Sequence, residues 1–341
     1  MLNPDLKLNP KIFNEDVEQT PIRKGFGEGL VKAGEADQNV VALCADLTES
    51  TQMILFAEKF PKRFVEVGVA EQNLVTVASG MAAMGKIPFC SSYAVFSPGR
   101  NWEQIRTTIA FNDQPVKIVG SHAGISVGPD GGTHQALEDI ALMRVLPNMD
   151  VISPCDSIEA RKATLALTKT GRPAYLRLAR EKTPIITTEE TLFEIGKSQI
   201  FWLPDVGLAQ AGIIATGSLV YRAIIAAKEL ESEGIKTKVM NLSSIKPIDA
   251  DAILALAKET KAIVTVEEHQ IMGGMGSAVA EVLAQNFPVP IEFIGVKDKF
   301  GQSGKPEELI EHYGMGKNSI KEAVKKVLKR KLLPKCAIME G

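Results

Sequence analysis

Short apolar, β-branched runs alternate with amphipathic stretches along most of the chain. In the first half the apolar runs predict strands at residues 40–45, 64–67, 88–91, 116–120, 150–153 and 174–178. Apolar positions at helical spacing predict helices between them, chiefly at residues 71–84, 102–110 and 158–168. Strands that alternate with helices favour a parallel sheet with helices on both faces.

Residues 182–205 show no clear period and predict a connection with one short strand. A second alternation follows, with strands expected at 212–215, 237–241, 262–266 and 291–294, and helices at 219–233, 250–260, 277–286, 306–313 and 319–331. A chain of 341 residues is long enough for two domains. We therefore expect an α/β protein of two domains, 15–190 and 205–332, each a mainly parallel sheet flanked by helices. The boundary is expected near residue 200, to within about ten residues.

Composition and charge argue against several classes of function. The formal net charge of −2 gives no electrostatic footprint for nucleic acid, so we expect no nucleic-acid partner. No apolar run reaches the roughly 18 residues that suggest a membrane span, and the first residues lack a secretory pattern. Cys44, Cys90, Cys155 and Cys336 are widely spaced with no CxxC pair, which is typical of reduced thiols in a cytoplasm.

Two of the four histidines lie in one glycine-rich segment, which reads S-H-A-G-I-S-V-G-P-D-G-G-T-H-Q over residues 121–135. His122, Asp130 and His134 follow a predicted strand, and a helix is expected to begin near Ala136. Ligands bind at the carboxyl ends of the strands in such sheets, so this is a candidate binding loop. Imidazoles beside a carboxylate can bind substrate hydroxyls and move protons near neutral pH. An ordinary surface loop explains the composition about equally well.

Further candidates are expected at the same edge of the sheet. Glu71 opens a helix directly after a strand, where the helix dipole alone also favours a carboxylate. Tyr93 and Phe96, three residues apart at a strand end, can form a stacking wall for a flat heterocycle or belong to the core. Arg23 and Arg180 suit the recognition of phosphate, although most arginines are only solvated.

A glycine cluster, G-G-M-G-S at residues 273–277, follows a strand and opens a helix, as a degenerate dinucleotide-binding turn would. The third glycine of that motif is missing, and six residues, 267–272, separate the cluster from the predicted strand. An ordinary helix-opening turn therefore explains it better than a nicotinamide site. His269 and His312 have no partner that the sequence identifies.

Taken together, these motifs resemble the carboxyl-terminal half of transketolase, a thiamine-diphosphate enzyme, from about residue 21 to residue 327. The loop at 121–135 is similar to the family's T-H-D-S-I-G-V-G-E-D-G-P-T-H-Q, with the same His–Asp–His spacing. The resemblance implies that His122, Asp130 and His134 hold the hydroxyls of a ketose donor. The segment V-G-V-A-E-Q-N is similar to the family's G-I-R-E-H and implies that Glu71 faces N1′ of the cofactor's aminopyrimidine. Glu71, His122 and His134 are the catalytic groups that it implies.

Tyr93 and Phe96 match the family's F-x-x-F, which stacks on the aminopyrimidine. The run A-D-L-T-E-S at residues 45–50 is similar to A-D-L-T-P-S, which implies that Asp46 lies near the cofactor. The family residues that hold the substrate phosphate are matched by Ser50, Arg23 and Arg180. In the second half, T-V-E-E-H and F-G-Q-S-G-K resemble the family's C-terminal domain, which carries no chemistry and mainly supports assembly.

The chain departs from the family in lacking a G-D-G motif, which binds diphosphate and Mg²⁺ in an amino-terminal domain. Its one Asp-Gly pair, Asp130-Gly131, already belongs to the candidate substrate loop. The resemblance therefore implies a split enzyme, with the missing half on a partner chain. It implies thiamine diphosphate shared between the chains, Mg²⁺ bound by the partner, homodimerisation in an α2β2 assembly, and sugar-phosphate substrates.

Three alternatives remain open. The β subunit of a 2-oxoacid dehydrogenase E1 has a similar length and a corresponding glutamate, but it lacks the G-x-D-G-x-T-H-Q loop and paired phosphate-binding arginines. Deoxyxylulose-phosphate synthase shares the A-E-Q run but is ordinarily one long chain. A non-catalytic scaffold would not need all the candidate residues. We therefore expect the C-terminal subunit of a cytoplasmic transketolase of the pentose phosphate pathway, which transfers a two-carbon ketol group between sugar phosphates.

Overall fold

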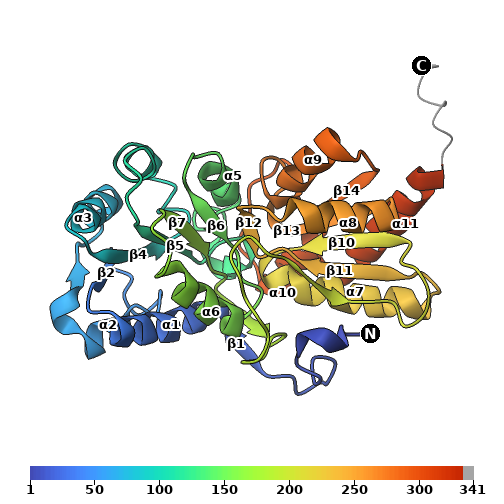
Figure 1. Ribbon diagram of the computed structural model, residues 1–341, viewed down its shortest axis with the longest axis horizontal. Coiled ribbons are helices and arrows are strands. Elements are labelled where there is room, and N and C mark those ends of the chain that lie inside the picture. The colour runs from blue at the N-terminus through green and yellow to red at the C-terminus, as the bar shows by residue number, and fades with distance from the viewer. Residues whose placement is uncertain (333–341) are drawn as a thin grey trace.

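Two helix-covered sheets lie side by side in the computed structural model, which describes residues 1–332 (Figure 1). The first sheet has the strand order β12-β6-β7-β5-β4-β2-β3 and is parallel except for β12. Its strands are β2 (Val40–Cys44), β3 (Phe64–Glu66), β4 (Ile87–Tyr93), β5 (Lys117–Ser121), β6 (Asp150–Ile152), β7 (Ala174–Arg177) and β12 (Ser244–Lys246).

The second sheet has the order β14-β13-β10-β11-β9 and is parallel except for β9. Its strands are β9 (Gln199–Trp202), β10 (Ala211–Ala215), β11 (Thr237–Asn241), β13 (Ile263–Gln270) and β14 (Ile291–Val296). A separate antiparallel pair consists of β1 (Gln19–Pro21) and β8 (Lys182–Pro184). The prediction of an α/β protein with two mainly parallel, helix-flanked sheets is confirmed.

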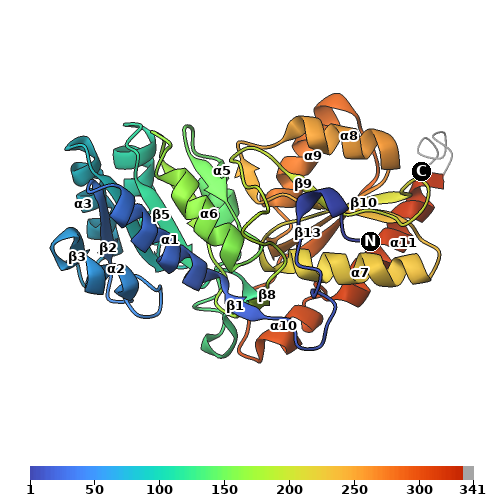
Figure 2. The same cartoon turned by 60° about the horizontal axis from the view of Figure 1, so that its bottom comes forward.

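Helices cover both faces of the first sheet (Figure 2). One face carries α1 (Ile22–Ala36), α2 (Ile54–Lys59) and α6 (Ser157–Leu167), and the other carries α3 (Glu71–Ala83), α4 (Trp102–Gln104) and α5 (Asp139–Arg144). The close packing of α1 on α6 requires glycine at position 25, because a Cβ there would lie 1.7 Å from the carbonyl oxygen of Ser157.

Two of the helix predictions for the first half need correction. The helix expected from Ala136 begins only at Asp139, and the helix predicted over 102–110 continues after α4 as a π-helix, η3 (Ile105–Ala110).

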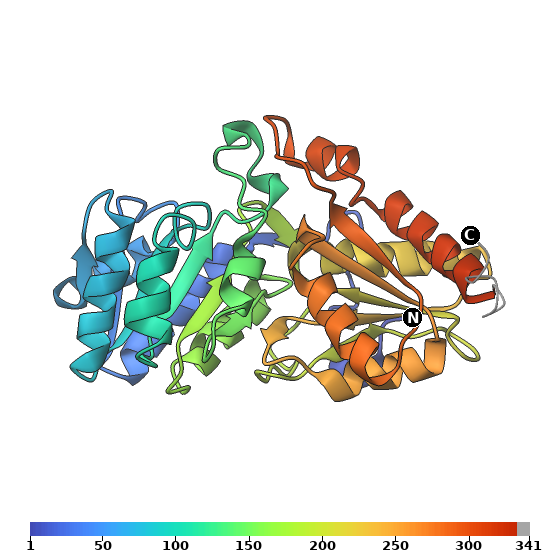
Figure 3. The same cartoon turned by 90° about the horizontal axis from the view of Figure 1, so that it is seen from above.

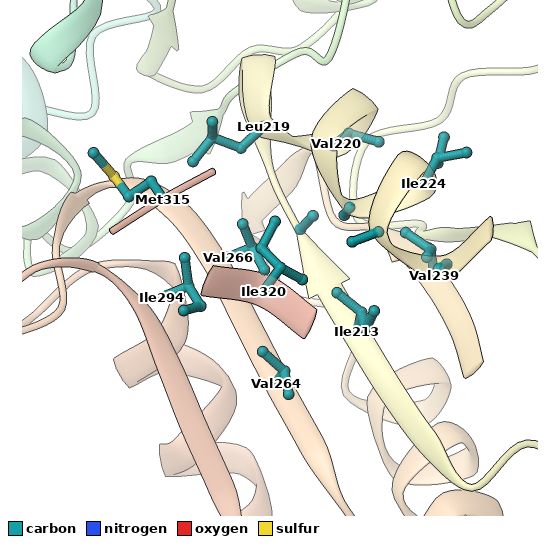
Figure 4. Packing of buried hydrophobic residues seen from close by; sticks show 14 of the residues in the cluster. Ile213, Leu219, Val220, Ile224, Val239, Val264, Val266, Ile294, Met315 and Ile320 are labelled. Carbon is teal, nitrogen blue, oxygen red and sulfur yellow. The ribbon is translucent and has the colours of Figure 1, made fainter. Parts of the chain in front are cut away.

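The second sheet is covered in the same way. One face carries α7 (Val220–Ser232) and α11 (Lys317–Leu332), and the other carries α8 (Ala250–Thr260) and α9 (Met275–Asn286). Figure 4 shows the first of these layers, where Ile224 of α7 and Ile320 of α11 pack on Ile213 and Val264 of the sheet. The helix α10 (Pro306–His312) and the short 3₁₀ turns η1 (Pro4–Leu6), η2 (Pro61–Arg63), η4 (Ile125–Asp130) and η5 (Gly217–Leu219) complete the fold.

The two halves of the chain are interleaved. Strand β12 comes from the second half but pairs with β6 at the edge of the first sheet, Ser244 opposite Ile152. This strand was not predicted, because its three residues, which end just before Pro247, show no period. In the other direction, the N-terminal segment lies along the second sheet (Figure 2), with the Asn3 amide donating to the Phe201 carbonyl at 2.9 Å. The connection at 182–205 also contains two strands, β8 and β9, where one was expected.

Candidate active site

Four parallel strands of the first sheet end together and position the loops that follow them. Cys44, the last residue of β2, lies opposite Glu66 of β3 and Ser91 of β4. Tyr93 at the end of β4 lies opposite Ser121 at the end of β5. This register brings the loops after β2, β3, β4 and β5 to one edge, as the sequence analysis predicted for a ligand site.

Four aromatic rings gather at this edge. The ring of Tyr93 stacks on that of His122 with the centroids 3.9 Å apart, and lies 6.0 Å from the nearly parallel ring of Phe96. His134 meets Phe96 edge-on at 5.4 Å and Tyr93 at 6.4 Å. We call Tyr93, Phe96, His122 and His134 the ring cluster. The stacking and the edge-on contacts are the arrangements that aromatic rings prefer.

Glu71 stands next to the ring cluster, in the first turn of α3. Its residue is only 3% exposed, and its carboxylate Oε1 lies 3.0 Å from Nη1 of Arg100. The Arg100 guanidinium in turn lies 4.2 Å from the centre of the Phe96 ring, and the amide of Asn101 donates to the Glu71 carbonyl at 2.8 Å. Arg100 was not predicted as a site residue, because it lies in an aperiodic turn. Its position four residues after Phe96 was the one available signal.

The two predicted phosphate-binding arginines come together beside His122. Arg23, in the first turn of α1, donates from Nη1 to the carbonyl of Arg180, and Arg180 donates to the carbonyl of Val127 in η4. The Nε of Arg23 is buried and has no hydrogen-bond partner within residues 1–332. Burial, followed by the positive charge of Arg180, lowers the pKa of Arg23. A buried N–H donor of a guanidinium that has a second arginine beside it fits an anionic ligand.

Three predicted residues are less firmly tied to this site. Within residues 1–332, the side chains of Asp46, Ser50 and Asp130 make no hydrogen bond or ion pair with any of the other predicted residues. The loop of Asp46 is nevertheless held at the same edge, because the Asp46 amide donates to the Glu66 carboxylate at 2.7 Å. Glu66 also accepts from the Thr48 hydroxyl at 2.9 Å. Glu66, which the sequence left without a role, therefore fixes the turn after β2 to the end of β3.

The electrostatics of His122 keep its ring neutral. The residue is 3% exposed, and burial, followed by the charges of Arg23 and Arg180, lowers its pKa to about 3. Its Nδ1 lies 2.9 Å from the Ser121 hydroxyl, so one ring nitrogen is engaged within the protein. A neutral imidazole at this position can bind a hydroxyl group without the cost of a buried charge.

We expect the low pKa of His122 to appear as an acid-side loss of stability. The unfolded chain binds a proton at this residue below a pKa of about 6.5, and the folded chain does not until about 3. The stabilising contribution is therefore fully present above pH 6.5 and is lost at about 1.4 kcal/mol per pH unit as the pH falls. His122→Asn, which tolerates the positive φ of 57° at this position, should remove that slope. Urea unfolding of variant and wild type at pH 6.5, 5.5 and 4.5 measures it.

The control is His312→Asn, which changes an exposed histidine at the C-terminal end of α10. Its slope should equal that of the wild type. Equal slopes for His122→Asn and the wild type would contradict a buried, neutral His122.

The glycine cluster at 273–277 serves the fold. The buried carboxylate of Glu267 accepts from the amides of Met275 and Gly276, at 2.6 and 2.8 Å, where α9 begins. Burial raises the pKa of Glu267 to about 7. The first amides of α9 are thus already bound by the chain's own carboxylate, which excludes the dinucleotide interpretation of this turn.

Neither a metal cluster nor a membrane span is found in the described part of the chain. Residues 1–332 contain no group of three or more His, Cys, Asp or Glu side chains placed to hold a metal ion. None of their helices is long and apolar enough to cross a bilayer.

Comparisons with known proteins agree with the motifs. The family models described as "Transketolase, pyrimidine binding domain" and "Transketolase, C-terminal domain" match residues 18–185 and 208–320. A putative transketolase C-terminal section from Methanocaldococcus jannaschii is 44% identical over 91% of this chain and 96% of its own. A 6-deoxy-6-sulfo-D-fructose transketolase subunit from Clostridium sp. is 38% identical over 94% of this chain and 98% of its own.

Among solved structures, a split-gene transketolase described as an inactive beta4 tetramer superimposes with a TM-score of 0.84 at 41% identity, over 91% of this chain and 99% of that one. The family models match both halves of the chain, and the split subunits match it over nearly their full length. Both comparisons indicate the same family. The chain belongs to the transketolase family and corresponds to its carboxyl-terminal section.

Proposed function

We propose that this chain is the C-terminal subunit of a split transketolase that transfers a two-carbon ketol group from a ketose phosphate to an aldose phosphate. It would comprise a pyrimidine-binding domain over residues 15–190 and a C-terminal domain over 205–332. One observation carries the proposal: a buried glutamate, a wall of aromatic rings and two arginines meet at one sheet edge.

The residues at this edge fit the aminopyrimidine half of thiamine diphosphate. Tyr93 and Phe96 lie at an interplanar angle of 16° and offer a flat apolar surface to a heterocycle. Glu71 would hydrogen-bond the ring nitrogen N1′ and hold a proton there, with Asp46 nearby on the loop after β2. When bound, the cofactor supplies an electron sink for the cleavage of a carbon–carbon bond.

The loop residues would bind the sugar. His122, neutral at physiological pH, and His134 would contact the donor hydroxyls, together with Asp130 from the tip of the loop. The substrate phosphate would lie against Arg23 and Arg180, where the Nε of Arg23, without a partner among the described residues, is available, with Ser50 beside it. This combination favours a phosphorylated ketose over the oxoacid substrates of an E1-type β subunit.

The proposal requires a partner chain. We assign the diphosphate and Mg²⁺ to an N-terminal subunit with a G-D-G motif, which this sequence lacks. The relatives named as a C-terminal section, a subunit and a split-gene product support this division. We expect homodimerisation within an α2β2 assembly. The free, buried thiols of Cys44, Cys90 and Cys155 support a reducing cytoplasm, and the pentose phosphate pathway is the expected setting.

Ketol transfer from xylulose 5-phosphate to ribose 5-phosphate, with thiamine diphosphate and Mg²⁺, tests the function. We expect no turnover by this chain alone and turnover when it is co-purified with the G-D-G partner, because the cofactor's two ends are held by different chains. Full activity of the isolated chain would contradict the split site. If the two chains associate but the complex turns over none of the donors tried, including 6-deoxy-6-sulfofructose, the proposal of ketol transfer is contradicted. If only the sulfonated donor reacts, the donor anion that the enzyme accepts is a sulfonate and not a phosphate.

A further inference from the structure

The candidate substrate loop, residues 122–134, lies against the second half of the chain. Figure 3 shows it projecting beside the segment that leads into α10. The amide of Ser126 donates to Oε1 of Glu268 in β13, at 2.6 Å across 142 residues of sequence. Gly128 faces Pro306, the first residue of α10: a Cβ at position 128 would lie 3.1 Å from the proline ring. The loop that carries both histidines is thus supported by the second domain.

The carboxylate of Glu268 is itself held in place. Its residue is 3% exposed, and its Oε2 accepts from the Ser218 hydroxyl at 2.8 Å. Its backbone carbonyl accepts from Arg177 at 2.8 Å, and Arg177 forms a buried ion pair with Asp139 at 2.7 Å. The carboxylate therefore presents a fixed acceptor to the loop, because Ser218 binds its second oxygen and Arg177, itself paired with Asp139, binds the backbone of the same residue.

The loop backbone is closely fitted to this carboxylate. Gly124 has a φ of 92°, and a Cβ there would lie 2.4 Å from Oε1 of Glu268. On the same side, Ser126, Ser218 and Glu268 border a cavity of about 310 Å³. Since open space adjoins the contact, removal of the carboxylate would leave solvent-accessible space where the Ser126 amide now has its acceptor.

A second contact holds the far end of the loop. The amide nitrogen of Gln135 donates to the carbonyls of Ile125 and Gln302, both at 3.0 Å. Gln302 belongs to the segment before α10. The histidines therefore lie on either side of a turn, η4, that the second domain holds at both ends.

We propose that Glu268 is a positioning residue that holds the loop so that His122 and His134 face the donor. The C-terminal domain then determines donor binding through one buried carboxylate. The kinetic part of this inference rests on the proposed function, whereas the effect on loop structure does not. A displacement of about 1 Å at a substrate-binding group can lower the rate by up to about a hundredfold.

Three variants of the full chain, each in complex with the N-terminal partner, test the proposal. Glu268→Ala removes the acceptor for the Ser126 amide. Glu268→Gln keeps one carbonyl oxygen for that amide and places its NH₂ group toward Ser218. Glu267→Ala is the matched control, since Glu267 is the neighbouring residue, is equally buried, and also accepts backbone amides, but only those at the start of α9. The measurements are amide hydrogen exchange over residues 122–134 and the kcat and KM for the ketose donor.

For Glu268→Ala we expect exchange in the loop to rise about tenfold and kcat/KM to fall about tenfold or more, mainly through KM for the donor. Glu268→Gln should restore most of both quantities. Glu267→Ala should lower the unfolding midpoint but leave the loop's exchange and the donor KM of the folded enzyme unchanged. A Glu268→Ala enzyme with wild-type exchange and KM, or an equal change in Glu267→Ala, would overturn the proposal.

If Glu268→Ala does not fold, Glu268→Asp replaces it, because the shorter side chain keeps the charge and withdraws the oxygen from the Ser126 amide. Hydrogen exchange also separates the positioning role of Glu268 from the proposed ketol transfer. Failure of ketol transfer in the wild-type complex would reject the proposed function, and the exchange comparison would still decide whether Glu268 positions the loop.

Discussion

Glu71→Gln is expected to lower ketol transfer by the reconstituted complex about 10³-fold, which is within the range for a lost acid–base group. The amide has nearly the same shape but can neither hold nor release a proton at the cofactor. Folding should be almost unaffected, because the ion pair that is lost joins Glu71 to an Arg100 side chain that is 49% exposed. Turnover, the urea midpoint and partner binding are measured on the same preparations.

The control is Glu103→Gln, which changes an exposed glutamate that also lies in the first turn of a helix, α4. This variant tests whether the loss of a first-turn carboxylate lowers activity merely through its interaction with the helix dipole. Its activity should equal that of the wild type. If Glu71→Gln keeps activity within about tenfold of the wild type, the role of Glu71 as cofactor activator is wrong.

Arg23→Gln should lower kcat/KM for a phosphorylated donor about 10- to 100-fold, because a hydrogen bond to a charged group contributes about 1.5–3 kcal/mol. The same ketose without its phosphate should react at nearly the wild-type rate with both enzymes. The comparison of xylulose 5-phosphate with xylulose measures this difference, since only the first donor carries the anion that Arg23 would bind.

Arg106→Gln is the matched control, because Arg106 is exposed on η3 and forms no ion pair within the described residues. An equal loss for both donors would show that Arg23 supports the fold of the loop rather than the phosphate. No loss for either donor would remove Arg23 from the site.

Local patterns in the sequence were sufficient to predict the layered architecture. The strand that ends at Cys44 is a continuous apolar run, and those that end at Tyr93 and Ser121 each contain a short apolar run, which is typical of a buried parallel sheet. The position of the candidate residues at the carboxyl ends of these strands followed directly. Strand β12 could not be predicted in the same way, because three residues before a proline carry no period and their partner, β6, lies about ninety residues earlier.

The parts of the site that were missed depend on contacts between distant segments. Arg100 reaches Glu71 only because α3 and the turn after Phe96 meet in space. Glu268 lies within T-V-E-E-H, a run noted as similar to a domain without chemistry, yet its carboxylate binds the loop of Ser126. A single sequence shows the type of each residue but not which of two adjacent buried glutamates faces the site.

The pairing of β12 with β6 limits how this protein can be divided. A cut within residues 182–205 would separate the two domains in sequence but would leave β6 with an unpaired edge, a template for aggregation. A chimaera that exchanged the C-terminal domain for that of a relative would have to supply a compatible β12 as well. The domains are therefore not independent modules, and their sequences must change together wherever this short strand joins them.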